Sequence, residues 1–368
     1  MSPYASPNDH RRYHYLELAN RLRVLLICDP ETDKSAASLA VNTGHFDDPV
    51  DRQGMAHFLE HMLFLGTRTY PKPGEYQQFM SRHGGSNNAW TGTEFTNFFF
   101  DIDNGFFEAG LDRFSQFFIC PTFAPEWVDK ERNAVDSEYR LKLQDDVRRS
   151  YQVHKETVNP AHPFSKFSVG NLDTLADLPG RDLRSDLIAF YETHYSADRM
   201  ALVMLSPASI ETQLGWCDRF FGTILDRRLG PPALSAPLYR LDDLGIRIQI
   251  APVKETRKLA LTFPLPSVDA LYDKKPLTFL SLVALLAGAL ELSAEEKAWI
   301  NAHGPVRVLL LPTAEPFYEA AHDGRPPGGF AIEMLEESER SSPIGAITAC
   351  ERVVTDQLEF LARHVPLG

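Results

Sequence analysis

The sequence predicts an α+β protein made of two related modules, each a mostly antiparallel β-sheet packed with helices. The first observation is a pair of β-rich runs, 21–28 and 36–43, joined by a charged turn, which is a pattern typical of paired strands. The second is that 245–251 and 259–265 repeat this arrangement. The third is that a helical segment rich in apolar residues follows each pair. The second module therefore resembles a repeat of the first.

A linker separates the two modules. Residues 229–237 read Leu-Gly-Pro-Pro-Ala-Leu-Ser-Ala-Pro, and this density of Gly, Pro and Ser interrupts both helices and strands. We therefore expect a first module at 1–229, a linker at 230–237 and a second module at 238–368.

Hydrophobic periodicity predicts the other elements. Aromatic and apolar residues at helical spacing in 104–119 indicate a core helix, and Pro125 begins a long helix that we expect to run to about Val153. The remaining expected elements are helices at 75–82, 182–194, 210–221, 277–292 and 347–364, and strands at 86–91, 95–103 and 199–205.

The composition is that of a globular protein with an acidic surface. Of 368 residues, 43% are hydrophobic and 24% are charged, which is enough to build a sizeable core. The net charge of -13 argues against a nucleic-acid or anionic-membrane partner and mildly favours cationic peptides. Residues 1–23 show no signal peptide, and the longest apolar run is too short to span a bilayer, so we expect a cytoplasmic protein. The scattered cysteines are expected to be small buried hydrophobes: Cys28, Cys120, Cys217 and Cys350.

Residues 54–66 carry the strongest functional signal. They predict a short, buried helix, preceded by an Asp-Asp-Pro start signal. His57 and His61 are four residues apart and project from one face, with Glu60 on the same side. Two imidazoles one turn apart are a common zinc half-site, and an adjacent carboxylate can take a proton from metal-bound water. This H-x-x-E-H pattern favours zinc over an accidental group of core side chains, because burying such a group without a metal would be costly.

A catalytic zinc ion usually has three protein ligands, so a third is expected on another element. The long helix that begins at Pro125 is rich in acids, and Glu131 and Glu138 lie seven residues apart on one face of it. Spacing alone does not choose among the candidates, each of which could equally belong to a solvated helix face. The candidates include Asp129, Asp136, Glu138 and Asp146.

Several motifs together resemble the pitrilysin/insulysin (insulinase-like) zinc metallopeptidases. The resemblance covers roughly residues 15–285 and is carried jointly by widely separated segments. These segments are 57–67 (His-Phe-Leu-Glu-His-Met-Leu-Phe-Leu-Gly-Thr), 85–91 (Gly-Ser-Asn-Asn-Ala-Trp-Thr), 131–138 (Glu-Arg-Asn-Ala-Val-Asp-Ser-Glu), 159–167 (Asn-Pro-Ala-His-Pro-Phe-Ser-Lys-Phe) and Gly170-Asn171.

The resemblance implies the insulinase-like metallopeptidase fold and assigns roles by position. His57, His61 and Glu138 would be the ligands of one zinc ion per chain, and Glu60 would be the general base. Glu131 would be the second carboxylate, which orients a ligand histidine.

The resemblance also implies how substrate binds. Asn88 and Ala89 would lie on an edge strand that pairs with the backbone of the cleaved peptide. The implied function is a zinc-dependent endopeptidase that hydrolyses short or unfolded peptides by Glu-assisted attack of zinc-bound water.

An alternative is a truncated or non-catalytic zinc- or peptide-binding subunit that needs a partner half. One-chain members of the family close a two-halved chamber around the peptide, and this chain ends inside the second of their four modules. The second module is therefore expected to be incomplete and metal-free, and Ala287–Glu291 departs from the family's Gly-rich turn. The expected partners are peptides and either a separate C-terminal-half chain or a second copy of this chain.

Overall fold

The computed structural model describes residues 8–234, 236–240, 242 and 246–254, together with three strands further along the chain. The chain divides into two compact units, Met1–Leu234 and Ser235–Gly368. The first unit combines one large sheet with helices, so the predicted α+β class is confirmed. The roles assigned to 1–229, 230–237 and 238–368 stay predictions.

Six strands of the first unit form one sheet in the order β1-β2-β6-β3-β5-β4. Neighbouring strands are antiparallel except β2 and β6, which run parallel. Along β3 and β5 the side chains alternate between buried and more exposed, so one face of the sheet is the core face. The strands are β1 (Arg12–Glu17), β2 (Arg23–Cys28), β3 (Lys34–Val41), β4 (Ser86–Thr91), β5 (Thr96–Asp103) and β6 (Met200–Ser206).

The predicted pairing of 21–28 with 36–43 is wrong. Both runs form strands, β2 and β3, but β6 lies between them. β6 is almost entirely apolar and alternates buried side chains along its length, which suits it to the middle of the sheet. The connection at 29–33 is long enough to cross the roughly 10 Å that separates next-nearest strands.

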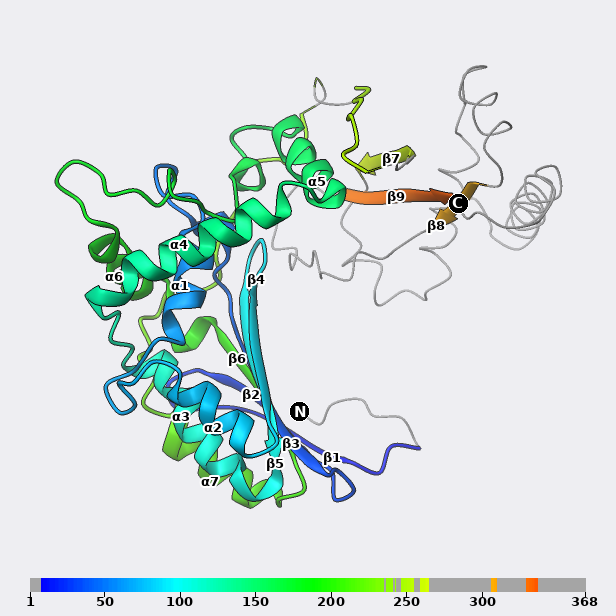
Figure 1. The fold of residues 1–368 in the computed structure, drawn as a ribbon. Helices are drawn as coiled ribbons and strands as arrows, with labels where there is room; N and C mark the ends of the chain where they lie inside the picture. The colour runs from blue at the N-terminus through cyan, green and yellow to red at the C-terminus, as the bar shows by residue number, and fades with distance from the viewer. Residues whose placement is uncertain are drawn as a thin grey trace, which may run out of the picture. The chain divides into compact units, whose positions relative to one another are not determined.

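Helices α1, α2, α3, α6 and α7 gather on the core face of the sheet, and α4 crosses near one end of it (Figure 1). α3 packs on β3, β5 and α7, whereas α1 packs on β4, α4 and α6. Between helices and sheet lies a core rich in aromatic rings, including Phe58, Phe98, Phe100, Phe107, Phe114 and Phe221. The helices are α1 (Met55–Leu63), α2 (Glu75–Arg82), α3 (Phe107–Ile119), α4 (Pro125–Lys142), α5 (Asp146–Thr157), α6 (Leu183–His194) and α7 (Ile210–Phe221), with short 3₁₀ turns η1 (His45–Asp47), η2 (Asn104–Phe106), η3 (Pro163–Ser165) and η4 (Ala197–Arg199).

The long helix expected from Pro125 to about Val153 is two helices. α4 ends at Lys142, and α5 begins at Asp146. The Asp145 carboxylate accepts hydrogen bonds from the backbone N–H groups of Val147 and Arg148, so it caps α5. Asp145 thus starts a second helix inside the segment that we predicted to be one continuous helix.

The described part of the second unit is a three-stranded antiparallel sheet in the order β7-β9-β8. Its strands are β7 (Leu259–Pro264), β8 (Val306–Leu309) and β9 (Gly329–Glu336). β7 matches the predicted run at 259–265, whereas 246–251 forms no strand, contrary to expectation. The predicted helices at 277–292 and 347–364, and the segment Ala287–Glu291, lie outside the described residues.

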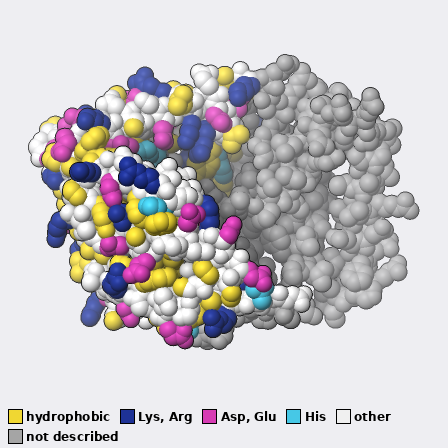
Figure 2. Space-filling model, turned by 60° about the horizontal axis from the view of Figure 1, so that its bottom comes forward, with side chains coloured by type: hydrophobic (Ala, Val, Ile, Leu, Met, Phe, Trp, Pro, Cys, Tyr) yellow, Lys and Arg dark blue, Asp and Glu magenta, His cyan; other side chains and the backbone are white. Residues whose placement is uncertain are grey.

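On the described face shown in Figure 2, acidic and basic side chains are interspersed with apolar ones. No helix in the described part of the chain is long and apolar enough to cross a membrane.

Candidate metal centre

A buried carboxylate fixes the start of α1. Asp48 Oδ2 accepts a hydrogen bond from Gly54 N at 2.7 Å, and Asp48 Oδ1 accepts one from Ala56 N at 2.8 Å. These N–H groups belong to the unpaired donors of a helix N-terminus, where a negative charge is also favoured by the helix dipole. Burial raises the pKa of Asp48 to about 7, against the opposing effect of these hydrogen bonds. Asp48 belongs to the start signal predicted from the sequence, and its carboxylate caps α1 across the loop at 49–53.

The two histidines of α1 each have one ring nitrogen occupied by an acceptor. His57 Nδ1 lies 2.6 Å from the carbonyl oxygen of Val169, and His61 Nδ1 lies 2.6 Å from Oε1 of Glu131. Because a carbonyl and a carboxylate accept, each Nδ1 carries the proton and donates it. The two Nε2 atoms are left facing each other at 3.2 Å.

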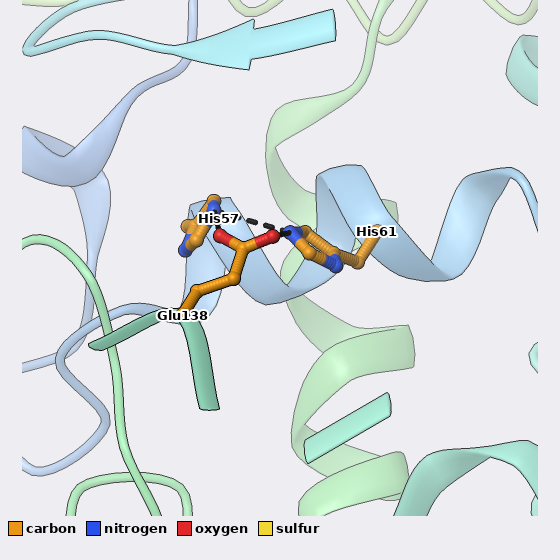
Figure 3. A group of neighbouring side chains, drawn as sticks. All are labelled: His57, His61 and Glu138. Atoms are coloured by element: carbon orange, nitrogen blue, oxygen red, sulfur yellow. Dashed lines mark hydrogen bonds and ion pairs between the residues drawn. The ribbon is translucent and has the colours of Figure 1, made fainter. Parts of the chain in front are cut away.

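Glu138 of α4 completes the group (Figure 3). Its Oε2 lies 3.8 Å from His57 Nε2, and its Oε1 lies 3.9 Å from His61 Nε2. The three side chains are the group of candidate metal ligands found in the described residues. They come from α1 and α4, which pack against each other.

This group fits a metal cation. Two Nε2 acceptors that face each other are unfavourable unless a proton or a cation lies between them. Ligand atoms at about 2.0–2.1 Å from a tetrahedral zinc ion are roughly 3.3 Å apart, which is close to the nitrogen–nitrogen separation here. Burial and the neighbouring charge of His61 lower the pKa of His57 to about 4, so its imidazole is in the neutral, metal-binding form at neutral pH.

Glu60 lies beside these side chains but outside the group of three. Only 7% of it is exposed, and its Oε2 accepts a hydrogen bond of 2.5 Å from the hydroxyl of Thr91 at the end of β4. Burial raises the pKa of Glu60, although the Thr91 hydrogen bond acts in the opposite direction. A carboxylate with a raised pKa, held by a neutral donor, is suited to accepting and returning a proton.

Asn88 and Ala89 lie on β4, at one edge of the six-stranded sheet. They pair with Phe99 and Phe98 of β5, so the other side of β4 has no partner among the described strands. Asn88 is exposed and Ala89 is buried. α1 packs against this strand, so the open edge runs past the helix that carries the histidines.

The structure distinguishes among the four acidic residues that helical spacing left as candidates for the third metal ligand. Asp129 pairs with Arg132, Asp136 with Arg140, and Asp146 with Arg149, each through a guanidinium one helical turn away. Of the four candidates, the structure brings only Glu138 to the two histidines. Helical periodicity could not make this choice, because it does not reveal which face of the predicted helix meets α1.

Three participants were absent from the predicted site. Thr91 lay within a quoted motif but had no assigned role, and Asp48 was read only as a helix start. The Val169 carbonyl could not have been found, because every residue carries one. A hydrogen bond accepted by a backbone carbonyl has no sequence signature of its own.

The H-x-x-E-H pattern on the buried helix α1 is the inverted zinc motif of a class of metallopeptidases. A family model described as insulinase (peptidase family M16) matches residues 23–161, and one described as the peptidase M16 inactive domain matches 182–287. The chain belongs to this insulinase family.

Named relatives agree with this membership. The A-factor-processing enzyme of Saccharomyces cerevisiae is 40% identical over 80% of this chain and 29% of its own length. The insulin-degrading enzyme of Homo sapiens is 42% identical over 80% of this chain and 30% of its own length. The chain therefore spans about 30% of the length of these curated relatives.

Solved structures agree on the fold. The crystal structure of pitrilysin matches 99% of this chain and 38% of its own, with a TM-score of 0.78 and 28% identity. The structure of a protease from Helicobacter pylori matches with a TM-score of 0.65 over 97% of this chain and 81% of its own. At 16% identity, that second match supports the fold alone.

Proposed function

We propose that this chain carries the zinc site of an endopeptidase and hydrolyses peptide bonds. The observation that carries the proposal is the convergence of His57 Nε2, His61 Nε2 and the Glu138 carboxylate, with both Nδ1 atoms already occupied. Two imidazole nitrogens and one carboxylate leave one position of a tetrahedral ion open, as in catalytic zinc sites. Zinc is also the metal in the printed name of one relative, a putative zinc protease of Schizosaccharomyces pombe.

In this proposal the chain's own residues orient the ligands and move the proton. A zinc ion held there would supply Lewis acidity, which acidifies a water and polarises the peptide carbonyl. Glu60 accepts the proton of the attacking water at Oε1 while Thr91 holds Oε2. Glu60 then donates that proton to the nitrogen of the leaving amine. Glu131 keeps the His61 ring in one orientation and one tautomer.

The substrate is proposed to be an extended peptide backbone that pairs with β4 at Asn88 and Ala89. The open edge of β4 offers backbone donors and acceptors at the spacing of a strand. Most backbone N–H and C=O groups of a folded protein are already paired with each other, so short or unfolded peptides are the proposed substrate class. A cytoplasmic location belongs to the same proposal.

A second candidate is a zinc- or peptide-binding subunit that turns over substrate only with a partner half. The observation that favours it is that the chain spans about 30% of the length of its curated relatives. If another chain supplies the residues that position the substrate, this chain alone cleaves several orders of magnitude more slowly, even with the metal site intact. The partner would be a separate C-terminal-half chain or a second copy of this chain.

Cleavage of a quenched fluorescent peptide tests the proposal and separates the two candidates. The wild type, Glu60→Gln and the exposed control Glu126→Gln are compared at equal zinc content. Cleavage by the wild type and the control, but not by Glu60→Gln, supports the peptidase. Zinc binding without cleavage by any of the three supports the subunit, and activity that appears on addition of the remaining half establishes it.

A further inference from the structure

Residues 166–172 (the strap) begin with the last two residues of the Asn-Pro-Ala-His-Pro-Phe-Ser-Lys-Phe motif at 159–167 and continue beyond it. The proposed chemistry gives this motif no role. The strap begins at Lys166, whose Nζ donates hydrogen bonds of 2.6 Å to the carbonyl oxygens of Phe46 and Asp48. Asp48 is the residue whose carboxylate holds the start of α1. Lys166 therefore links the strap to residues 46–48, the turn whose Asp48 carboxylate caps the start of α1.

The middle of the strap lies against α1. Phe167 N donates to Oε1 of Gln53 at 2.7 Å, and the Val169 carbonyl accepts the Nδ1 proton of His57. Gly54 and Gly170 approach so closely that a Cβ on Gly54 would lie 2.3 Å from the Cα of Gly170. This backbone contact sets the distance between the strap and the first turn of α1.

The end of the strap is held by α4. Leu172 N donates to Oδ1 of Asp136 at 3.2 Å, and the other oxygen of Asp136 accepts from Nε of Arg140 at 2.5 Å. Asp136 is 7% exposed, and it lies two residues before Glu138 on the same helix. One short segment thus contacts the histidine helix and the glutamate helix in succession.

We propose that the strap is a positioning element, and that its anchors Lys166 and Asp136 set the register of α1 against α4 so that the His57 and Glu138 atoms converge. The inference rests on the proposed metal function. Neither anchor belongs to the group of candidate ligands. Lys166 holds the first residue of the strap through its own side chain, and Asp136 holds the last residue through the backbone N–H of Leu172.

The Asp136 anchor is tested by two substitutions, one that removes the acceptor of the Leu172 N–H group and one that keeps it. Asp136→Ala removes the acceptor of Leu172 N, whereas Asp136→Asn keeps an oxygen there and loses the charge and the second acceptor that pair with Arg140. Zinc dissociation constants are measured by competition with a chromophoric chelator. Asp136→Ala is expected to weaken binding about tenfold and Asp136→Asn less than threefold, by analogy with outer-shell losses in metal sites. Wild-type affinity in Asp136→Ala, or an equal loss in both variants, overturns the proposal.

The Lys166 anchor is tested with a matched lysine. Lys34 makes a similar pair of bonds, to the Gly84 carbonyl at 2.6 Å and to Asp101 at 2.8 Å, at the start of β3. Lys166→Met is expected to shift the visible absorption bands of the Co²⁺-loaded chain and to weaken zinc binding about tenfold. Lys34→Met is expected to change neither. Identical spectra and affinities for the two variants contradict a positioning role for Lys166.

A metal-free measurement separates this inference from the proposed function. In the wild type, ¹⁵N NMR of the histidine rings should show His57 protonated at Nδ1, as its bond to Val169 requires. In Lys166→Met, with cooperative thermal unfolding retained, a mixture of tautomers is expected. If the wild type binds no metal but this tautomer change occurs, the proposed function fails and the positioning role stands. An unchanged tautomer overturns the positioning role.

Discussion

His61 Nδ1 and Glu131 Oε1 are 2.6 Å apart, and this bond joins the two helices that supply the candidate metal ligands. The other histidine is held differently, because His57 Nδ1 donates to the Val169 carbonyl. Burial acts to lower the pKa of His61, but the Glu131 hydrogen bond and the nearby carboxylates outweigh it, so this pKa is raised. The pKa of His57, without such a partner, is lowered. The pKa values of the two imidazoles are thus shifted in opposite directions.

Loss of Glu131 should weaken metal binding. Glu131→Ala removes the acceptor that fixes the His61 ring, and we expect zinc affinity to fall roughly 10–100-fold. Glu131→Gln keeps an oxygen acceptor and should lose less. Isothermal titration at pH 7.5 measures both, with Glu126→Gln as the control. Undiminished affinity in Glu131→Ala would show that the bond to His61 does not orient a ligand.

Metal affinity should depend on pH through His61. A proton on His61 Nε2 competes with the metal, and the raised pKa of His61 keeps that proton bound to a higher pH than in a free histidine. Affinity should therefore fall about tenfold per pH unit as pH drops below this raised pKa. His57 adds a second loss only near its own pKa of about 4. In Glu131→Ala the first loss should move to lower pH, and a midpoint that does not move would contradict the assignment.

The hydroxyl of Thr91 should set the acid side of the pH–rate profile. Its hydrogen bond lowers the pKa of Glu60 against the effect of burial, so Thr91→Val should raise that pKa further. Because the base must be ionised, the acid limb of kcat/KM should shift to higher pH. Thr91→Ser keeps the hydroxyl and should restore the wild-type limb. The same shift in both variants would assign the effect to packing.

Gly54 should be intolerant of any side chain. It adopts φ +94°, and a Cβ there would lie 2.3 Å from Gly170 Cα. Gly74, at φ +79°, precedes α2 in the same way but has nothing within 4 Å of its Cβ position. Gly74→Ala should cost about 1–2 kcal/mol for the left-handed backbone alone, and Gly54→Ala measurably more. Urea unfolding compares the two, and equal losses would mean that the Gly54–Gly170 contact is unimportant.

Sequence reasoning worked best where the determinants are local. The spacing of His57, Glu60 and His61 fixes which helix face they share, and α2 has the predicted bounds because glycines flank its pattern on both sides. The order of strands could not be read from local patterns, because β6 enters the sheet from more than 150 residues further along the chain. β1 was missed since it is an edge strand of mostly exposed, polar residues.

The site, like the fold, was predictable where its determinants are local in the sequence and not where they depend on long-range contacts. The resemblance supplied Glu131 and Glu138 by position, and the structure then placed both carboxylates beside the histidines. The strap was invisible as a functional element, because its contacts to His57 and Asp136 are made by a backbone carbonyl and a backbone N–H. Only the folded chain shows which backbone groups meet which side chains.

The most direct test of the account is the zinc content of the purified chain after dialysis, measured by elemental mass spectrometry. The wild type should retain about one zinc per chain, since three ligands converge on one point. Glu138→Ala should lose most of it, whereas Asp129→Ala, a change on the same helix outside that group, should retain it. A wild type without zinc, or full zinc content in Glu138→Ala, would contradict the assignment of this site.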